Sequence, residues 1–267
     1  MTKKIIVIYN CSKYSKIKDL NQFIINYKKY KPGTAHTLII CFKNLDNKEI
    51  IKRKKILRKI KYVSYIDPQI NNDFEWGSQK RLAELYKNHF FFFLNDFSYP
   101  ICKNWLKIFA SHIKKNYIIG SMGNLSSHFK NSLYRKRNEN YFTFVIKIIY
   151  SYINYNNFPN PHIRSTGFMY HAKAYLDFFK DKIVTNKRLS HYYESGKNGM
   201  SNFFFKKKYS VFIVNSDNKK FDLVNGKKSL TYASGNQEKL IISDKKTRVY
   251  QKSDKLGKKK MTKQAWG

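Results

Sequence analysis

A run of four phenylalanines and a leucine at residues 90–94 constrains the fold of this chain more than any other feature. Such a continuous apolar run is typical of a strand that is buried on both faces of a parallel sheet. The run ends at Asn95, Asp96 and Ser98, and helical spacing then resumes over residues 101–109. Because ligands of open α/β sheets bind at the carboxyl ends of strands, Asn95 and Asp96 are candidate ligand-binding residues. An ordinary turn after a core strand is the alternative.

Apolar runs and segments with helical spacing alternate along the chain. Strands are predicted at residues 4–9, 37–42, 62–66, 90–94, 117–120 and 209–214, and helices at 16–30, 46–61, 78–87 and 101–114. Strand-then-helix order predicts an α/β domain with a mostly parallel central sheet flanked by helices. Residues 139–155 are predicted to form a core helix because they are rich in Phe, Ile and Tyr, and residues 162–170 to cross back over the sheet. Residues 121–140 show no clear period and are predicted to form an active-site loop.

The chain divides by composition near residue 214. Residues 1–214 carry the predicted strands and helices and are expected to form one domain. Residues 215–267 are polar and rich in lysine, so they are expected to form a basic extension that packs on the domain or trails from it as an extended or partly disordered arm. Trp266 indicates that the end of this extension docks. No apolar segment approaches membrane-spanning length, and a cytoplasmic location is expected.

The chain is strongly basic, with 53 Lys and Arg against 17 Asp and Glu and a formal net charge of +36. This charge predicts an anionic partner, such as nucleic acid, phospholipid headgroups or a phosphorylated substrate. The competing interpretation is that lysines are scattered evenly because Lys, Asn, Ile, Tyr and Phe dominate the whole composition. No nucleic-acid-binding motif is present, so no specific nucleic acid is expected. A basic, aromatic-rich nucleic-acid-binding protein remains the alternative from another functional class.

Three polar sites follow apolar strands and are predicted to converge at one edge of the sheet. Asn95 and Asp96 offer a carboxylate for a metal or a sugar. His162 and Arg164 offer a cation pair for phosphate charge, and Glu194 offers a second carboxylate as a general base. This set suits the transfer of a group from a diphosphate leaving group. The alternatives are a surface pair at His162 and Arg164, and a helix cap at Glu194 for a helix that begins near residue 197.

Several short motifs recur in an order that resembles one enzyme class. They are D-x-x-x-G at residues 73–77, N-D-F-S at 95–98, W-L at 105–106, H-I-R-S-T-G-F-M at 162–169, E-S-G at 194–196, S-D-K-K-T-R-x-Y at 243–250 and A-W-G at 265–267. The sequence thereby resembles the GT-A class of nucleotide-sugar-dependent glycosyltransferases, and within it the family-2-like and rhamnan-synthesis-type bacterial enzymes.

The resemblance implies a GT-A-like domain and an inverting, hexosyltransferase-like activity in polysaccharide biosynthesis. It implies a nucleotide-diphospho-sugar donor and a surface-glycan or lipid-linked oligosaccharide acceptor, at a cytoplasmic site or peripherally at the inner, anionic face of a membrane. It further implies that Asn10 and Asp67 contact the nucleotide with Asp73 close by. Asp96, through a divalent Mn or Mg ion, would hold the diphosphate or the donor sugar, and Glu194 would deprotonate the acceptor hydroxyl.

The sequence departs from this class at two positions. The strand end that matches the D-x-D motif reads Leu94-Asn95-Asp96-Phe97 and carries one acidic residue. Glu194 is followed by a serine where the family-2 pattern has E-D, so Glu194 itself would act as the base. His162 and Arg164 are expected to replace part of the metal charge at the leaving diphosphate. A protein of this shape that has lost activity is a third alternative.

Overall fold

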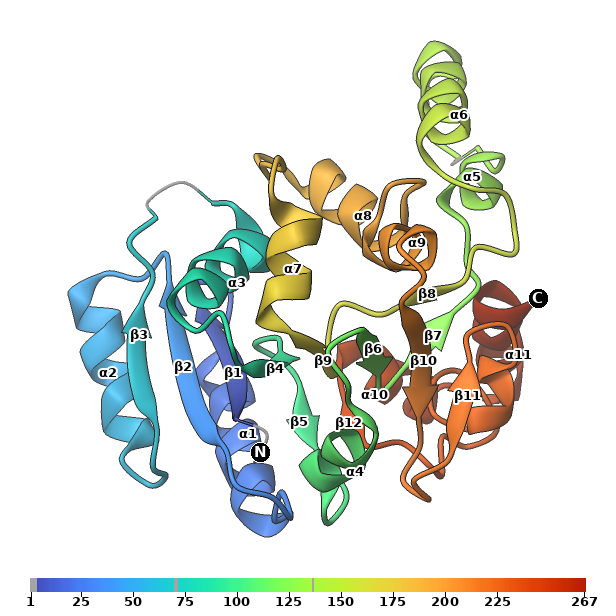
Figure 1. The fold of residues 1–267 in the computed structure, drawn as a ribbon. Helices are drawn as coiled ribbons and strands as arrows, with labels where there is room; N and C mark the ends of the chain where they lie inside the picture. The colour runs from blue at the N-terminus through green and yellow to red at the C-terminus, as the bar shows by residue number, and fades with distance from the viewer. Residues whose placement is uncertain (1–3, 70–71, 136) are drawn as a thin grey trace.

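The computed structural model describes residues 4–69, 72–135 and 137–267 (Figure 1). Within these residues, one large sheet contains eight strands. From one edge to the other they are β11 (Lys220–Asp222), β10 (Ser210–Val214), β6 (Tyr117–Gly120), β9 (Phe168–His171), β4 (Phe90–Leu94), β1 (Ile5–Ser12), β2 (Thr37–Lys43) and β3 (Val63–Ile66). Adjacent strands run parallel except that β9 is antiparallel to β4 and β6, and β11 is antiparallel to β10. The predicted α/β class with a mostly parallel sheet is confirmed.

The chain changes direction across the sheet between β1 and β4. It builds outward from β1 through β2 to β3 and then returns to place β4 on the other side of β1. Val7 of β1 accordingly pairs with Leu38 of β2 on one side and with Phe92 of β4 on the other. Open α/β sheets bind ligands beyond the carboxyl ends of the strands at such a switch point.

Helices cover both faces of the sheet, which explains the continuous apolar run in β4. Helices α1 (Ile17–Lys29), α2 (Asn47–Leu57) and α4 (Trp105–His112) pack on one face, and α3 (Phe74–Leu85), α7 (Ala172–Phe179), α8 (Lys187–Ser195) and α9 (Met200–Lys206) on the other. Phe92 belongs to the first core, whereas Phe91 and Phe93 belong to the second. Successive side chains of a strand point to opposite faces, so every position of β4 is buried.

The region between β6 and β9 differs from its prediction. The stretch predicted as a loop contains β7 (Gly123–Asn124) and α5 (His128–Ser132), while residue 136 lies outside the described residues. Strand β8 (His162–Ile163) pairs with β7 ahead of β9. The predicted core helix forms as α6 (Tyr141–Asn154), but it stands away from the sheet beside α5 (Figure 1), and Ser151 is its one buried residue. The prediction that α6 belongs to the core is therefore wrong.

The expected extended arm at the carboxyl terminus is folded. It contains the 3₁₀ turn η1 (Gly226–Ser229), β12 (Ile242–Ser243), α10 (Lys245–Lys252) and α11 (Lys255–Trp266). Strand β12 pairs with β5 (Tyr99–Pro100), which follows β4 directly. Trp266 packs in a third core with Met122 and Tyr232 and donates to the Tyr232 carbonyl at 2.8 Å.

The extension is folded because its sparse apolar residues pack against the domain, which a pattern search within the extension alone cannot detect. None of the helices in the described part of the chain is long and apolar enough to cross a membrane.

Candidate functional site

Asp96 joins the ends of the two central strands at the switch point. Its Oδ2 accepts hydrogen bonds from the Ser12 hydroxyl at 2.6 Å and the Ser15 hydroxyl at 2.9 Å, and its backbone carbonyl accepts from the Tyr9 hydroxyl at 2.9 Å. Asp96 is 5% exposed. Burial raises the pKa of its carboxyl group, and the two serine hydrogen bonds offset only part of that effect. The predicted site residue thus lies buried at the switch point, with one carboxyl oxygen held toward β1.

Asn10 lies beside the same strand end. It follows Tyr9, which pairs with Leu94, so Asn10 is level with Asn95 across the strand pair. The residue is buried, and within the described part of the chain nothing donates to its Oδ1. A buried acceptor left without a partner costs ~1–3 kcal/mol, so such an atom marks a place where a ligand donor would be stabilising.

Asn95 serves the local turn instead. Its Oδ1 accepts from the Ser98 hydroxyl and from the Phe97 backbone N–H at 3.3 Å. This arrangement agrees with the turn interpretation of that residue. No group of three or more His, Cys, Asp or Glu side chains able to hold a metal occurs among the described residues. Asp96 is the single carboxylate at the end of β4. One carboxylate does not fit a divalent cation that is held by the protein alone.

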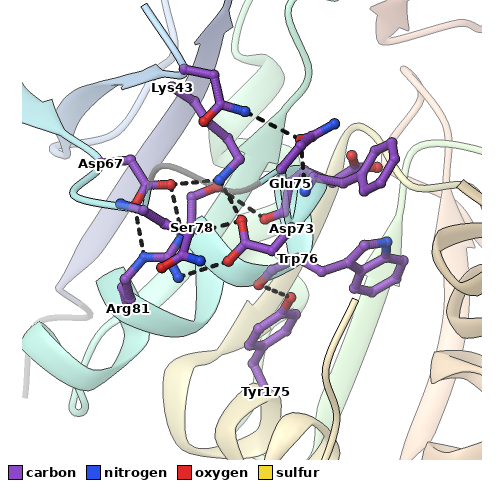
Figure 2. Close-up of polar contacts among 12 residues, drawn as sticks. Lys43, Asp67, Asp73, Glu75, Trp76, Ser78, Arg81 and Tyr175 are labelled. Carbon is purple, nitrogen blue, oxygen red and sulfur yellow. Dashed lines mark hydrogen bonds and ion pairs between the residues drawn. The ribbon is translucent and has the colours of Figure 1, made fainter. Parts of the chain in front are cut away.

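Asp67 and Asp73 lie in a closed ion-pair network (Figure 2). Lys43, the last residue of β2, donates to Asp67 at 2.7 Å and also to Asp73. Arg81 of α3 forms a two-pronged contact with Asp67, Nε to Oδ1 and Nη2 to Oδ2, both at 2.7 Å. Its Nη1 donates to Asp73 at 2.7 Å.

Burial alone would raise the pKa of Asp67, but the hydrogen bonds and charges of Arg81 and Lys43 outweigh it and hold that pKa below its usual value. The two carboxylates predicted to contact a nucleotide are thus already paired with two cations. Asp73 and Arg81 also line a cavity of about 540 Å³ beside Lys80 and Lys182.

His162, Arg164 and Glu194 line one cavity of about 240 Å³, together with His128 of α5 and Lys246 of α10. The predicted convergence of the His162–Arg164 pair with Glu194 is present in this geometry. Glu194 lies in the last turn of α8, and its Oε1 accepts from the Ser165 backbone N–H at 3.1 Å.

The capping alternative for Glu194 is wrong. The next helix, α9, begins at Met200, and Gly199 is the residue that precedes it. A carboxylate near the carboxyl end of its own helix is disfavoured by the helix dipole. Local helix stability therefore does not explain why this position is acidic.

His162 does not supply the expected positive charge. Burial lowers the pKa of its imidazole, which the nearby Glu194 carboxylate opposes. Its Nδ1 lies 2.7 Å from the Asn160 carbonyl, which can only accept, so Nδ1 carries the proton and Nε2 of the neutral ring is an acceptor.

Arg164 is charged, but its charge is shared. Burial would lower its pKa, yet the Asp244 carboxylate raises it, and Nη2 donates to Asp244 at 2.6 Å. The guanidinium also lies 4.1 Å from the centre of the Tyr232 ring. Both partners come from the carboxyl-terminal extension, so the predicted cation is partly neutralised by a segment that sequence analysis did not place in the site.

Three further residues belong to this region and were missed. Burial, reinforced by the charges of Glu194 and Asp96, raises the pKa of Glu75 to about 7. Glu75 therefore responds to the charges of both candidate sites. Lys246 lines the cavity of Glu194, and Arg248 donates to the Phe97 carbonyl at 3.0 Å beside Asp96. The signal for the latter two was the S-D-K-K-T-R-x-Y motif at residues 243–250. No signal distinguished Glu75 from a surface glutamate.

The comparisons with known proteins found similarity among solved structures. No protein-family model matches the sequence, and no curated protein matches it. TarS of S. aureus is 13% identical with a TM-score of 0.43, over 79% of this chain and 35% of TarS. The galactosyltransferase LgtC, solved with donor and acceptor sugar analogues, is 10% identical with a TM-score of 0.40, over 79% of this chain and 73% of LgtC. HddC from Yersinia pseudotuberculosis is 10% identical with a TM-score of 0.42, over 75% of this chain and 96% of HddC.

This chain spans between 35% and 62% of the TarS structures. Likeness at these identities and scores is too weak to assign a function. The chain's own residues are therefore the basis for a functional assignment.

Proposed function

We propose that this chain is a glycosyltransferase that moves a sugar from a nucleotide-diphospho-sugar to a hydroxyl group. One observation carries the proposal: the switch point between β1 and β4 holds the buried, unpartnered Oδ1 of Asn10 beside Asp96. Switch points are where open α/β sheets bind nucleotides. The motifs that resemble GT-A enzymes support the same reaction class.

The reaction would be a single displacement. The acceptor oxygen forms a bond to the anomeric carbon while the bond from that carbon to the diphosphate oxygen breaks, and the nucleoside diphosphate departs with the bonding electrons. Glu194 would take the proton of the acceptor hydroxyl, because its carboxylate lines a cavity and is anchored through one oxygen by the Ser165 N–H. A positioned base of this kind contributes ~10²–10⁴ in rate. Attack from the face opposite the leaving group gives inversion at that carbon.

The departing diphosphate needs positive charge that is not already paired. Lys43, Arg81 and Arg164 are each held by carboxylates of the chain. Lys246 and Arg248 are the better candidates, because Lys246 lines the cavity of Glu194 and Arg248 lies at the end of β4. Charges fixed in a partly enclosed site stabilise a leaving group that gains negative charge in the transition state.

The acceptor would be a hydroxyl of a surface glycan or a lipid-linked oligosaccharide. The cavity of about 240 Å³ has room for a single sugar unit rather than a long glycan, and its lining is polar, with Asn124, Asn131 and Gln264 beside Glu194. Amide groups of this kind recognise sugar hydroxyls through hydrogen bonds.

A thermal-shift screen of nucleotide sugars, with and without Mn²⁺, tests the proposal. A ligand at 100 times its dissociation constant stabilises the native state by ~2.7 kcal/mol, which raises Tm by several degrees in a chain of this size. We expect at least one nucleoside-diphosphate sugar to raise Tm more than its nucleoside monophosphate does. If no nucleotide sugar shifts Tm and a nucleic acid does so at physiological salt, the nucleic-acid-binding alternative replaces this proposal.

A further inference from the structure

Helix α6 carries an apolar face that the described part of the protein leaves uncovered. Phe142, Ile146, Ile149 and Ile153 are spaced by four, three and four residues, which places them in one stripe along the helix. Their exposed fractions are 73%, 49%, 54% and 61%. Monomeric proteins rarely expose contiguous apolar surface of this kind without using it for binding.

The helix also projects from the rest of the chain. It stands at the far end of α5 with no sheet behind it (Figure 1). Its fourteen residues are ~21 Å long, which is too short to cross a bilayer but sufficient to lie along its surface. Tyr134, Tyr141 and Tyr152 are exposed around it, and tyrosine favours the boundary between headgroups and hydrocarbon.

Cations lie on α6 and beside its carboxyl-terminal half. Lys147 lies 4.9 Å from the Phe144 ring centre, Arg188 lies 4.7 Å from that of Tyr150, and Lys197 donates to the Tyr152 carbonyl at 2.9 Å. Of these three cations, Lys147 also forms an ion pair with Glu139, at 2.7 Å. A polar surface dominated by cations beside an apolar stripe fits an anionic lipid bilayer.

We propose that α6 and these cations form a membrane-docking surface for anionic lipid. The apolar stripe enters the headgroup boundary, and the cations bind lipid phosphates. A second copy of the chain fits this surface less well, because it would bring the same cations together in a protein whose net charge is +36.

The docking surface lies next to the cavity of Glu194. The Lys197 backbone N–H donates to the Asn154 carbonyl at the end of α6 at 2.8 Å, just after Glu194 in the chain. His128 of α5 lines the cavity, and α5 packs beside α6. Docking through α6 therefore places the opening of that cavity near the lipid surface, which suits a lipid-linked acceptor if the proposed transferase function is correct.

Vesicle binding of the full chain tests the docking surface without any acceptor or nucleotide. The probes are vesicles of phosphatidylglycerol with phosphatidylcholine, compared with phosphatidylcholine alone, at 0.1 M and about 0.5 M salt. A variant with Phe142→Ser, Ile146→Gln, Ile149→Gln and Ile153→Gln should partition at least about tenfold more weakly to the anionic vesicles. The control variant carries Ile25→Gln, Ile51→Gln and Leu85→Gln, which are exposed by 58%, 56% and 64% on other helices, and should bind like the wild type.

The salt concentration separates the apolar contribution to vesicle binding from the electrostatic one. Screening weakens headgroup attraction, so at about 0.5 M salt the wild type and the control should retain binding through the apolar stripe while the α6 variant loses it. Equal binding of all three proteins would overturn the proposal, as would absent binding of the wild type to anionic vesicles. Light scattering that shows a wild-type dimer dissociated by the α6 changes would assign the stripe to self-association instead.

A single substitution covers the case in which the fourfold variant fails to fold. Ile149→Trp places a fluorophore in the stripe, and we expect its emission to shift to the blue and to be quenched by brominated anionic lipid. Leu256→Trp, at a position that is 76% exposed on α11, should remain unquenched. Quenching at both positions or at neither would contradict docking through α6. These outcomes do not depend on nucleotide-sugar binding, so failure here leaves the thermal-shift test of the proposed function unaffected.

Discussion

Two groups of carboxylates differ in how completely the protein pairs them. Asp67 and Asp73 share Lys43 and Arg81 in a network that fixes the ends of β2 and β3 to α3 (Figure 2). Glu194 lines a cavity and has a single backbone donor to one oxygen, from Ser165. A carboxylate already bound by two cations has little capacity left for a substrate, whereas a singly anchored one can accept a proton. The first group therefore serves stability and the second is suited to chemistry.

Asp67→Asn should have the largest effect on stability. Removing this charge leaves the buried Lys43 and the partly buried Arg81 with one carboxylate fewer, and breaking a buried pair in this way costs ~3–5 kcal/mol. Asp217→Asn is the matched control, since Asp217 pairs with Lys239 at 2.9 Å on the surface with a side chain that is 40% exposed. The control should cost less than about 1 kcal/mol in urea unfolding.

The pH dependence sharpens this difference. Because the pKa of Asp67 is depressed in the folded state, its stabilisation is present above its unfolded value of ~3.9 and is lost as pH falls through the lower folded value. The gap between wild type and Asp67→Asn should therefore narrow below about pH 4. Equal costs for the two aspartates at neutral pH would remove the structural role that we assign to the network.

Glu194→Gln should have the largest effect on chemistry. Glutamine keeps the shape and an acceptor oxygen for the Ser165 N–H but cannot take a proton, so transfer should fall by about 10² or more while donor affinity is kept. Calorimetry of donor binding and a transfer assay on the same preparation measure both quantities. Glu84→Gln, on the exposed side of α3, is the control and should leave transfer unchanged. Wild-type transfer by Glu194→Gln would exclude Glu194 as the base.

Asp96→Asn should have a smaller effect, on donor binding. The asparagine oxygen can still accept from Ser12 and Ser15, so the strand ends should stay joined, but the negative charge at the switch point is lost. The amide also accepts hydrogen bonds from the sugar hydroxyls of a donor more weakly than the carboxylate does, so we expect donor affinity to fall by about tenfold, which corresponds to ~1.4 kcal/mol. The exposed Asp181→Asn serves as the control. Unchanged donor affinity in Asp96→Asn would place the donor elsewhere, with the cavity beside Arg81 as the next candidate.

Apolar segments became buried in β4 and largely exposed in α6, and this difference shows what the sequence could predict. The run at residues 90–94 was correctly predicted as a doubly buried strand, because a short strand that is covered on both faces buries every side chain of such a run. Residues 139–155 were also rich in apolar residues, but a helical pattern specifies a face and not what covers it, so α6 was wrongly placed in the core. Burial of a helix depends on contacts distant in sequence, which a local pattern does not contain.

The candidate site was predictable only in part for the same reason. Asp96 and Glu194 follow or border strongly patterned elements, and their positions could be inferred. The neutral state of His162 could not, because it depends on enclosure by other segments. The pairing of Arg164 with Asp244 joins residues 80 positions apart, through an extension whose sparse apolar residues gave no periodic signal.

Glu75 provides the last test, because it is only partly accessible to solvent and its pKa responds to the charge of Glu194. Burial and the charges of Glu194 and Asp96 raise its pKa to about 7, so the folded state binds a proton that the unfolded state has released between pH 4.5 and about 7. Stability contributed by this proton is present below the unfolded value and is lost as pH rises through the folded value. Relative to Glu75→Gln, the wild type should therefore lose roughly 2–3 kcal/mol of stability between pH 5 and 8, as measured by urea unfolding at each pH. Glu84→Gln should follow the wild type at every pH. A constant difference between the wild type and Glu75→Gln over this range would mean that Glu75 is ionised throughout, and that burial and the charge of Glu194 do not raise its pKa.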